Sequence, residues 1–310
     1  MSAADPNDSR RPSAQPLRTP VFARDLLKER VILITGGGSG LGLSMAEGLG
    51  AVAAQVIITG RSAERLGSAA ERLRSQGIKV QPLVCDVREP EQVTEAVKKA
   101  IEHCGRIDGL INNAAGNFLV AAEDLTPGGF DAVVRTVLYG TVNCTLEVGR
   151  HLIARGAAGS VLSILTPYAW TGSAFVLPSA CAKAGVLAMT RSLAVEWGQY
   201  GIRLNAIAPG PFPTDGAWQR LVPEPSLIEG MVQRRIPMGR VGEHSELANL
   251  AVFLMSDASP YQNGDCVTID GGSWLSGAGE FSEYTALPRE QVKTVFRAMR
   301  PAKKPKAGTP

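Results

Sequence analysis

The chain has 310 residues, of which 45% are hydrophobic and 20% charged, a composition typical of a folded globular protein with a sizeable core. Disordered, collagen-like and disulfide-scaffold classes are excluded. The net charge is +3, but five basic residues lie in the last fourteen positions without one acid, so the rest of the chain carries −2 and a surface that coats nucleic acid is not expected.

The cysteines and the two ends of the chain suggest no metal site and no targeting signal. Five widely spaced cysteines form no CxxC pair and have only three histidines to join them, so we expect reduced, packed thiols. The longest uncharged window, residues 156–182, holds two prolines and six Ser/Thr residues and cannot form a membrane-spanning helix. We predict a flexible arm over residues 1–20, a flexible basic tail over residues 301–310 and a soluble, cytoplasmic protein without a membrane partner.

Short β-branched runs alternate with longer segments of helical apolar spacing along the chain. The predicted strands are 31–35, 56–59, 79–84, 109–112, 161–165, 202–208 and 266–269. The predicted helices are 41–50, 63–76, 91–104, 130–155, 179–198 and 245–256. This alternation predicts an α/β fold: a single doubly wound Rossmann-type domain over residues 21–300, with a seven-stranded parallel sheet and helices on both faces. The Pro- and Gly-rich segment 209–242 is predicted to be a substrate lid.

A glycine-rich turn, T-G-G-G-S-G-L-G over residues 35–42, follows the first predicted strand and opens a helix. Its backbone N–H groups and the helix N-terminus can face a pyrophosphate. The turn fits T-G-x-x-x-G-x-G and not the common G-x-G-x-x-G; a turn without a ligand is the alternative. We predict cofactor contacts at Gly36, Gly38, Ser39, Gly40 and Leu41.

The ends of the next two strands indicate which dinucleotide binds. An NAD site usually has an acid after the second strand, but this chain has Arg61 and Ser62 there, which can donate hydrogen bonds to a 2′-phosphate. NADP(H) is therefore the predicted cofactor, and a solvated arginine is the alternative. After the third strand, Asp86 and Val87 are expected beside the adenine, although Asp86 could equally form a turn.

The glycine-rich turn, Asn112-Asn113-Ala114-Ala115-Gly116 and Pro209-Gly210-Pro211 together resemble the short-chain dehydrogenase/reductase superfamily over most of the chain. That superfamily carries Tyr-x-x-x-Lys about thirteen residues after a catalytic Ser. Lys183 is present here, but Ser179 replaces the tyrosine, Thr166 occupies the Ser position, and Val137 stands where an asparagine is common. Because a serine hydroxyl is a far poorer acid than a phenol, this argues against ordinary carbonyl reduction. The resemblance also implies cofactor contacts at Asn113, Ala114, Lys183, Pro209, Gly210 and Phe212.

A tyrosine reappears at Tyr168, fifteen residues before Lys183, and Asn117 directly follows the Asn-Asn-Ala-Ala-Gly turn. This arrangement is similar to the 2,4-dienoyl-CoA reductases of the tyrosine-containing mitochondrial type, and the resemblance runs from Phe22 to Met299. Further matching segments are F-V-L-P-S-A-C-A-K-A-G at 175–185, P-G-P-F-P-T at 209–214, Q-R-L at 219–221, I-P-M-G-R at 236–240 and G-E-F at 279–281.

The chemistry of such a reductase suits these residues. Hydride delivered to the far end of a dienoyl thioester produces a dienolate whose oxygen needs hydrogen-bond donors, and Tyr168 and Asn117 can supply them. Lys183 would hold the nicotinamide ribose and polarise Tyr168, Ser179 would support that network, and water would protonate the α-carbon to give a 3-enoyl product. The alternatives are a packing tyrosine, a loop-capping amide at Asn117 and a helix N-cap at Ser179.

The resemblance further implies an acyl-CoA substrate, a role in unsaturated fatty acid β-oxidation and a homotetramer. Arg88 and Arg220 correspond to CoA contacts, and Phe118 and Thr126 to the entrance of the same site; a solvated surface charge is the alternative for either arginine. Two other functions stay open. Thr166 and Tyr168 could rebuild a carbonyl or alcohol oxidoreductase site, or the chain could be a non-catalytic NADPH-sensing module, although a sensor needs neither Tyr168 nor Lys183.

Overall fold

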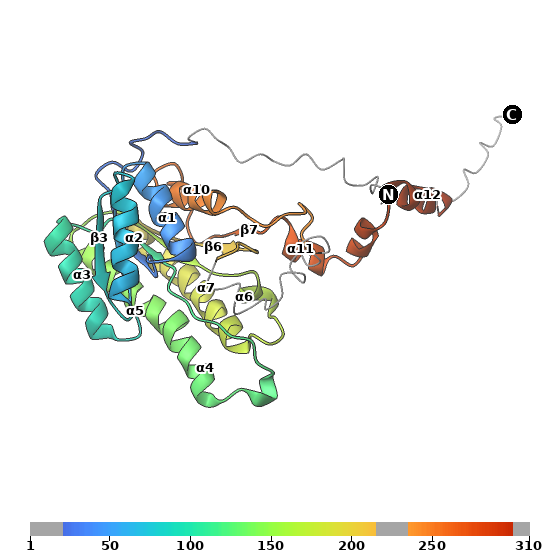
Figure 1. Cartoon of the computed structure of the whole chain (residues 1–310), viewed down its shortest axis with the longest axis horizontal. Helices are drawn as coiled ribbons and strands as arrows, with labels where there is room; N and C mark the ends of the chain where they lie inside the picture. The colour runs from blue at the N-terminus through green and yellow to red at the C-terminus, as the bar shows by residue number, and fades with distance from the viewer. Residues whose placement is uncertain (1–20, 215–234, 300–310) are drawn as a thin grey trace.

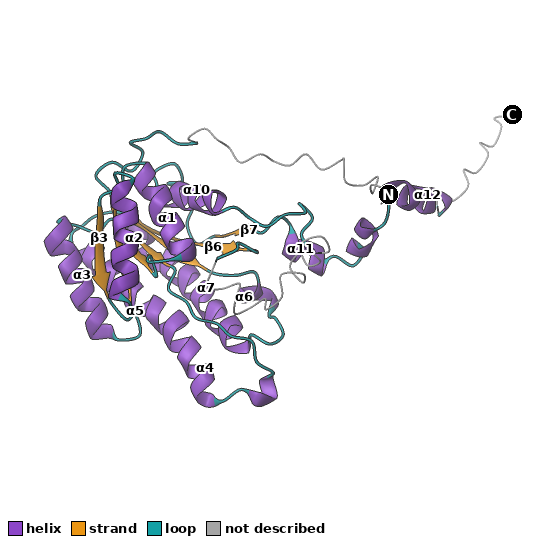
Figure 2. Ribbon diagram, viewed as in Figure 1, coloured by secondary structure: helices purple, strands orange, loops and turns teal. Residues whose placement is uncertain are grey.

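The computed structural model describes residues 21–214 and 235–299, and one parallel sheet forms the centre of that part (Figures 1 and 2). Its seven strands lie in the order β3-β2-β1-β4-β5-β6-β7, and every neighbouring pair is parallel. The predicted single doubly wound domain with seven parallel strands is confirmed. The strands are β1 Val31–Thr35, β2 Gln55–Gly60, β3 Val80–Val84, β4 Gly109–Asn112, β5 Gly159–Ile164, β6 Ile202–Pro209 and β7 Cys266–Ile269.

Helices cover both faces of the sheet (Figure 2). On β1, Ile32 and Ile34 point into the core formed with α1, α2 and α10, whereas Val31 and Leu33 point into the core formed with α3, α5 and α7. This double burial explains why the strands are continuous apolar runs. The helices are α1 Gly40–Ala51, α2 Ala63–Ser75, α3 Pro90–Cys104, α4 Pro127–Val134, α5 Gly140–Ala154, α6 Tyr168–Thr171, α7 Leu177–Trp197, α10 His244–Met255, α11 Ser273–Ala278 and α12 Arg289–Ala298.

The helix predicted over residues 130–155 differs most from the structure. It begins earlier, at Pro127, because the Thr126 hydroxyl accepts a hydrogen bond from the Gly129 N–H (3.1 Å) and caps α4. A π-helical segment, Arg135–Tyr139, then joins α4 to α5. The segment contains Val137, and π-helical turns frequently occur next to functional sites.

The chain beyond β7 lies apart from the sheet (Figure 1). Here α11, the 3₁₀ turn Ser282–Ala286 and α12 form an arm that the sequence analysis did not predict. The rings of Tyr284 and Phe296 make an edge-to-face contact at 5.2 Å within it. Several of its large apolar side chains are exposed: Leu275, Phe281, Leu287, Val295 and Met299.

Parts of the predicted organisation lie outside the described residues. These are the arm 1–20, the tail 301–310 and the central portion of the predicted lid, of which residues 209–214 and 235–242 are described. Within the described ranges, every helix is too short or too polar to cross a bilayer.

Candidate active site

The strand order brings two of the predicted motifs together. Because β1 pairs with β4, the glycine-rich turn after β1 lies beside the loop after β4, at the point where the sheet order reverses. The Asn113 side-chain amide donates to the carbonyls of Thr35 (3.0 Å) and Gly36 (3.2 Å), and the Thr35 hydroxyl accepts from the N–H groups of Asn113 and Ala114 (both 3.0 Å). Asn113 thus holds the glycine-rich turn in shape, a role the sequence analysis did not assign.

The turn itself fits a dinucleotide pyrophosphate. Gly36 and Gly40 have φ of +66° and +52°, which favour glycine, and a Cβ on Gly42 would lie 2.4 Å from the Gly36 carbonyl oxygen. Ser39 makes no side-chain cap at the start of α1, and the first turn of that helix contains no acid. Within the described residues, no side chain caps the first N–H groups of α1, and a helix start of this kind can bind an anion.

Gly42→Ala is expected to weaken NADPH binding at least tenfold and to lower the free energy of unfolding by ~1–3 kcal/mol, since the Cβ would overlap backbone. Gly67→Ala is the matched control: nothing lies within 4 Å of a Cβ there, on α2, and it should stabilise the protein by ~0.5–1 kcal/mol. Urea unfolding and NADPH fluorescence titration measure both effects. Unchanged NADPH affinity in Gly42→Ala would contradict the assignment of this turn.

The predicted NADP-specific residues follow β2 and β3. Arg61 is exposed, and the Ser62 hydroxyl accepts from the Arg65 N–H (3.3 Å) as the N-cap of α2. Asp86 accepts hydrogen bonds from the Arg88 N–H (3.1 Å) and guanidinium (2.5 Å to Nη2). The bond from the Arg88 N–H is the turn contact expected if Asp86 forms a turn. These bonds from Arg88, with its charge and that of Arg61, lower the pKa of Asp86.

Tyr168 and Asn117 meet at the ends of β4 and β5. Tyr168 is the first residue of α6, and its hydroxyl accepts from the Asn117 side-chain amide at 3.4 Å and lies 3.0 Å from the Ser179 hydroxyl. The Asn117 amide oxygen accepts from the Phe118 N–H (2.9 Å), which turns its NH₂ group toward Tyr168. Three predicted catalytic residues from separate segments therefore share one hydrogen-bonded cluster.

Ser179 is not a helix cap. α7 begins at Leu177 with Val176 as its N-cap, so Ser179 lies inside the first turn, and only 2% of it is exposed. The helix-cap alternative for Ser179 is therefore wrong. Its buried hydroxyl points to Tyr168.

Lys183 lies one helical turn beyond Ser179 and is 7% exposed. Its ammonium donates to the carbonyl of Ile164, the last residue of β5. Burial lowers the pKa of Lys183 to about 8, because the charged form loses its hydration. An ammonium has three donors, and in the described residues only this one partner is seen, so the group suits ribose hydroxyls.

Two buried hydroxyls at strand ends have no hydrogen-bond partner in the described part of the chain: Thr59, on β2, and Thr166, two residues after β5. Unpartnered buried hydroxyls are rare, and each needs a reason. Both lie at the carboxyl edge of the sheet, where a doubly wound fold binds its ligand. Both oxygens are also shielded from solvent, so the structure does not show that either reaches a bound ligand.

The predicted substrate residues have other contacts in the structure. Phe118 packs on a buried cluster of Val133, Val137 and Ala182, Thr126 caps α4, and Arg88 binds Asp86. Val137, at the superfamily's asparagine position, is thus a core residue. Arg220 lies outside the described residues.

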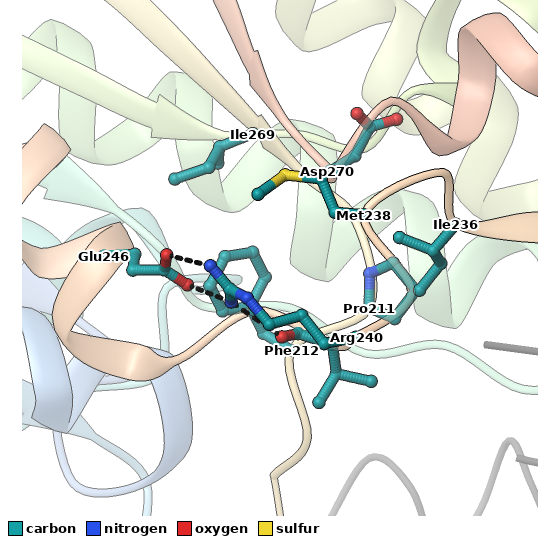
Figure 3. Close-up of a pocket in the computed structure, with 11 residues that line it drawn as sticks. Pro211, Phe212, Ile236, Met238, Arg240, Glu246, Ile269 and Asp270 are labelled. Carbon is teal, nitrogen blue, oxygen red and sulfur yellow. Dashed lines mark hydrogen bonds and ion pairs between the residues drawn. The ribbon is translucent and has the colours of Figure 1, made fainter. Parts of the chain in front are cut away.

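A small pocket lies beside the loop that follows β6 (Figure 3). Arg240 in its wall binds both carboxylate oxygens of Glu246 (2.9 and 2.6 Å). A Cβ on Gly242 would lie 2.3 Å from the Phe212 ring, which is 7% exposed, so the Phe212 side chain is a packing element. The Gly210 N–H donates to Ile269 of β7, and Pro209 lies in register with Ile269.

Comparison with known proteins identifies the class. A family model described as Enoyl-(Acyl carrier protein) reductase matches residues 36–273. The structure of a gluconate 5-dehydrogenase from Burkholderia cenocepacia J2315, in complex with NADP and tartrate, superposes with a TM-score of 0.76 at 33% identity, covering 82% of this chain and 99% of that one. The chain belongs to the short-chain dehydrogenase/reductase superfamily.

Within this superfamily, the resemblance to the 2,4-dienoyl-CoA reductases is confirmed. The probable 2,4-dienoyl-CoA reductase [(2E)-enoyl-CoA-producing] of Bacillus subtilis (strain 168) is 43% identical over 81% of this chain and 98% of its own length. The peroxisomal 2,4-dienoyl-CoA reductase [(3E)-enoyl-CoA-producing] of Arabidopsis thaliana is 39% identical over 90% of this chain and 93% of its own length. The names of these two relatives differ in the position of the product double bond.

Proposed function

We propose that this protein is an NADPH-dependent 2,4-dienoyl-CoA reductase that yields 3-enoyl-CoA in the degradation of unsaturated fatty acids. The observation that carries the proposal is the contact of the Tyr168 hydroxyl with the Asn117 amide, 3.0 Å from the hydroxyl of Ser179, which replaces the superfamily's tyrosine. This pair can donate to an oxyanion, whereas Ser179 is too weak an acid to protonate a ketone-derived alkoxide. Both relatives are named 2,4-dienoyl-CoA reductases; the name of the Arabidopsis relative gives the 3-enoyl product, whereas that of the Bacillus relative gives a 2-enoyl product.

The mechanism follows from the residues around the reacting carbons. Bound NADPH would supply the hydride to the far end of the conjugated dienoyl thioester. The negative charge then develops on the thioester oxygen, where Tyr168 and Asn117 would each contribute ~3–4 kcal/mol of transition-state stabilisation. Ser179 can donate to the phenol oxygen, which leaves the Tyr168 proton for the substrate. A water molecule would protonate the α-carbon and complete the 3-enoyl product.

Lys183, the glycine-rich turn and the strand-end residues would hold the cofactor. The buried Lys183 ammonium would donate to the nicotinamide ribose, and its charge would favour a polarised Tyr168. The pyrophosphate would lie on the turn from Gly36 to Gly42. The adenosine would reach the ends of β2 and β3, close to Arg61 and Asp86.

Arg61 is expected to set the preference for NADPH. Arg61→Ala should raise the KM for NADPH about tenfold, because a charge-assisted hydrogen bond to the 2′-phosphate is worth ~1.5–3 kcal/mol, and should leave the KM for NADH within about twofold. Steady-state kinetics with each cofactor checks this. An equal change for both cofactors would place Arg61 away from the 2′-phosphate.

The acyl-CoA carrier, the homotetramer and the cytoplasmic location belong to the same proposal. Phe118, Thr126, Arg88 and Arg220 would border the CoA entrance. A homotetramer would cover apolar side chains that are exposed on one chain, among them Val195 of α7, which is 85% exposed, and those of the C-terminal arm. The Arabidopsis relative is named peroxisomal, so the compartment of this protein is to be tested by direct localisation.

A carbonyl or alcohol oxidoreductase is the second candidate, favoured by the unpartnered Thr166 hydroxyl at the superfamily's serine position. One experiment separates the two. NADPH oxidation is followed by absorbance with a 2,4-dienoyl-CoA as the only acceptor, with NADH in parallel and simple ketones as alternative acceptors. Fast turnover of the dienoyl-CoA supports the reductase, and reduction of ketones alone would overturn it.

A further inference from the structure

His244, the first residue of α10, connects two segments that border the cofactor site. Its Nε2 lies 2.6 Å from the Pro213 carbonyl oxygen, in the loop after β6, and its Nδ1 lies 2.7 Å from the Ser44 hydroxyl in α1. Ser44 in turn lies 3.1 Å from the carbonyl oxygen of Gly40, in the glycine-rich turn. The chain of contacts therefore runs from that turn to the Pro213 loop.

The partners of the ring fix one of its protons. A carbonyl oxygen only accepts, so Nε2 must carry a hydrogen and donate to Pro213. In one arrangement, Nδ1 accepts the hydroxyl proton of Ser44, and no hydrogen remains for the contact between Ser44 and the Gly40 carbonyl. In the other arrangement, Nδ1 donates to the Ser44 oxygen, and the Ser44 hydroxyl donates to Gly40. The donation from Nε2 to Pro213 is common to both arrangements.

The loop that His244 holds lies directly against the glycine-rich turn. A Cβ on Gly40 would be 3.3 Å from the Thr214 methyl group. Backbone hydrogen bonds fix the start of the loop, from Gly210 to Ile269 (2.9 Å) and from Gly242 to Pro211 (3.0 Å). The hydrogen bond to the Pro213 carbonyl instead comes from the His244 side chain.

We propose that His244 is a positioning residue for the nicotinamide cofactor, which fixes the distance between the Pro213–Thr214 segment and the glycine-rich turn. The inference rests on the proposed cofactor site. Loss of the Nε2 donor removes one restraint on the segment, and the cofactor must supply that restraint on binding. NADPH affinity should fall about tenfold, the worth of one hydrogen bond, while kcat at saturating NADPH stays within about twofold.

Two near-isosteric substitutions separate the two nitrogens of the ring. His244→Gln places an amide NH₂ near the Nε2 position and can still donate to Pro213, whereas His244→Asn reaches only the Nδ1 position and Ser44. NADPH binding is measured by nicotinamide fluorescence without substrate, and thermal unfolding of the apoprotein is recorded beside it. We expect His244→Gln to bind within about threefold of wild type and His244→Asn about tenfold more weakly. Ser44→Ala keeps the Pro213 contact and removes the link from His244 to Gly40, so it should weaken NADPH binding, but less than His244→Asn does, because α10 stays packed on α1.

The outcomes are distinct. Equal NADPH affinities of His244→Asn and wild type would overturn the inference. It would also be overturned if His244→Gln and His244→Asn lost NADPH affinity equally and in parallel with their thermal stability. Because binding is measured without a dienoyl-CoA, tight NADPH binding without turnover would overturn only the proposed reductase activity. Absence of NADPH binding to the wild-type protein would overturn both.

Discussion

Tyr168→Phe is expected to lower kcat on a 2,4-dienoyl-CoA by about 10²- to 10³-fold, the cost of removing one oxyanion donor. The ring remains, so packing at the start of α6 is kept, and only the hydroxyl that meets Asn117 and Ser179 is lost. NADPH affinity should be unchanged, because the phenol serves the substrate oxygen. Stopped-flow NADPH oxidation and fluorescence titration measure the two quantities separately.

Tyr261→Phe is the matched control for Tyr168→Phe. Tyr261 is fully exposed, so removal of its hydroxyl should leave kcat and NADPH affinity at the wild-type level. Wild-type speed in Tyr168→Phe would exclude it as the oxyanion donor. A parallel loss of NADPH affinity would indicate that Tyr168 holds the cofactor instead.

Lys183→Met is expected to abolish most turnover and NADPH binding and yet to stabilise the apoprotein at pH 7 by ~1–3 kcal/mol. The folded protein buries the Lys183 ammonium, which has one hydrogen-bond acceptor among the described residues, and its burial costs desolvation free energy. Methionine fills a similar volume without this cost. Removal of the ammonium also removes the donor for the ribose. A stabilised but inactive variant is typical of a residue kept for function.

The pH dependence gives the sign of the Lys183 effect. Burial lowers its pKa to about 8 from 10.5, so between these values the unfolded chain holds a proton that the folded protein lacks. From pH about 8 to 10.5, the free energy of unfolding of wild type should therefore rise by up to ~3 kcal/mol relative to that of Lys183→Met. The stability advantage of Lys183→Met should shrink by the same amount. Loss of the ammonium should lower kcat/KM for NADPH above pH about 8. Urea unfolding at pH 7 and pH 10 checks the stability claim, and equal differences at both would contradict it.

Much of the fold could be predicted because its local and global signals agree. β-branched runs bounded by turns set every strand end within two residues, and both faces of β1 are buried as the continuous run Val31–Thr35 implies. The π-helical segment Arg135–Tyr139 could not be predicted, because its residues suit an ordinary helix and its hydrogen-bond shift depends on neighbours. The short α6 and the C-terminal arm have too few periodic residues to be recognised.

The site was predictable where a motif sits at a strand end and not where it depends on tertiary contact. Tyr168 and Asn117 follow neighbouring strands, β5 and β4, so their meeting follows from the topology. From the sequence, Ser179 was equally consistent with a helix cap. The helix α7 begins two residues earlier than predicted, and no local sequence signal marks that start. The link from His244 to Pro213 and Ser44 joins positions far apart in sequence, and no motif marks it.

The position of the product double bond tests the central claim most directly. The protein, NADPH and a 2,4-dienoyl-CoA are incubated in D₂O, and the product is analysed by NMR. Protonation of a dienolate at the α-carbon predicts 3-enoyl-CoA with one deuterium at the α-carbon and the NADPH-derived hydrogen at the far end of the former diene. A 2-enoyl product, or reduction of ketones with no reaction of the dienoyl-CoA, would contradict the account.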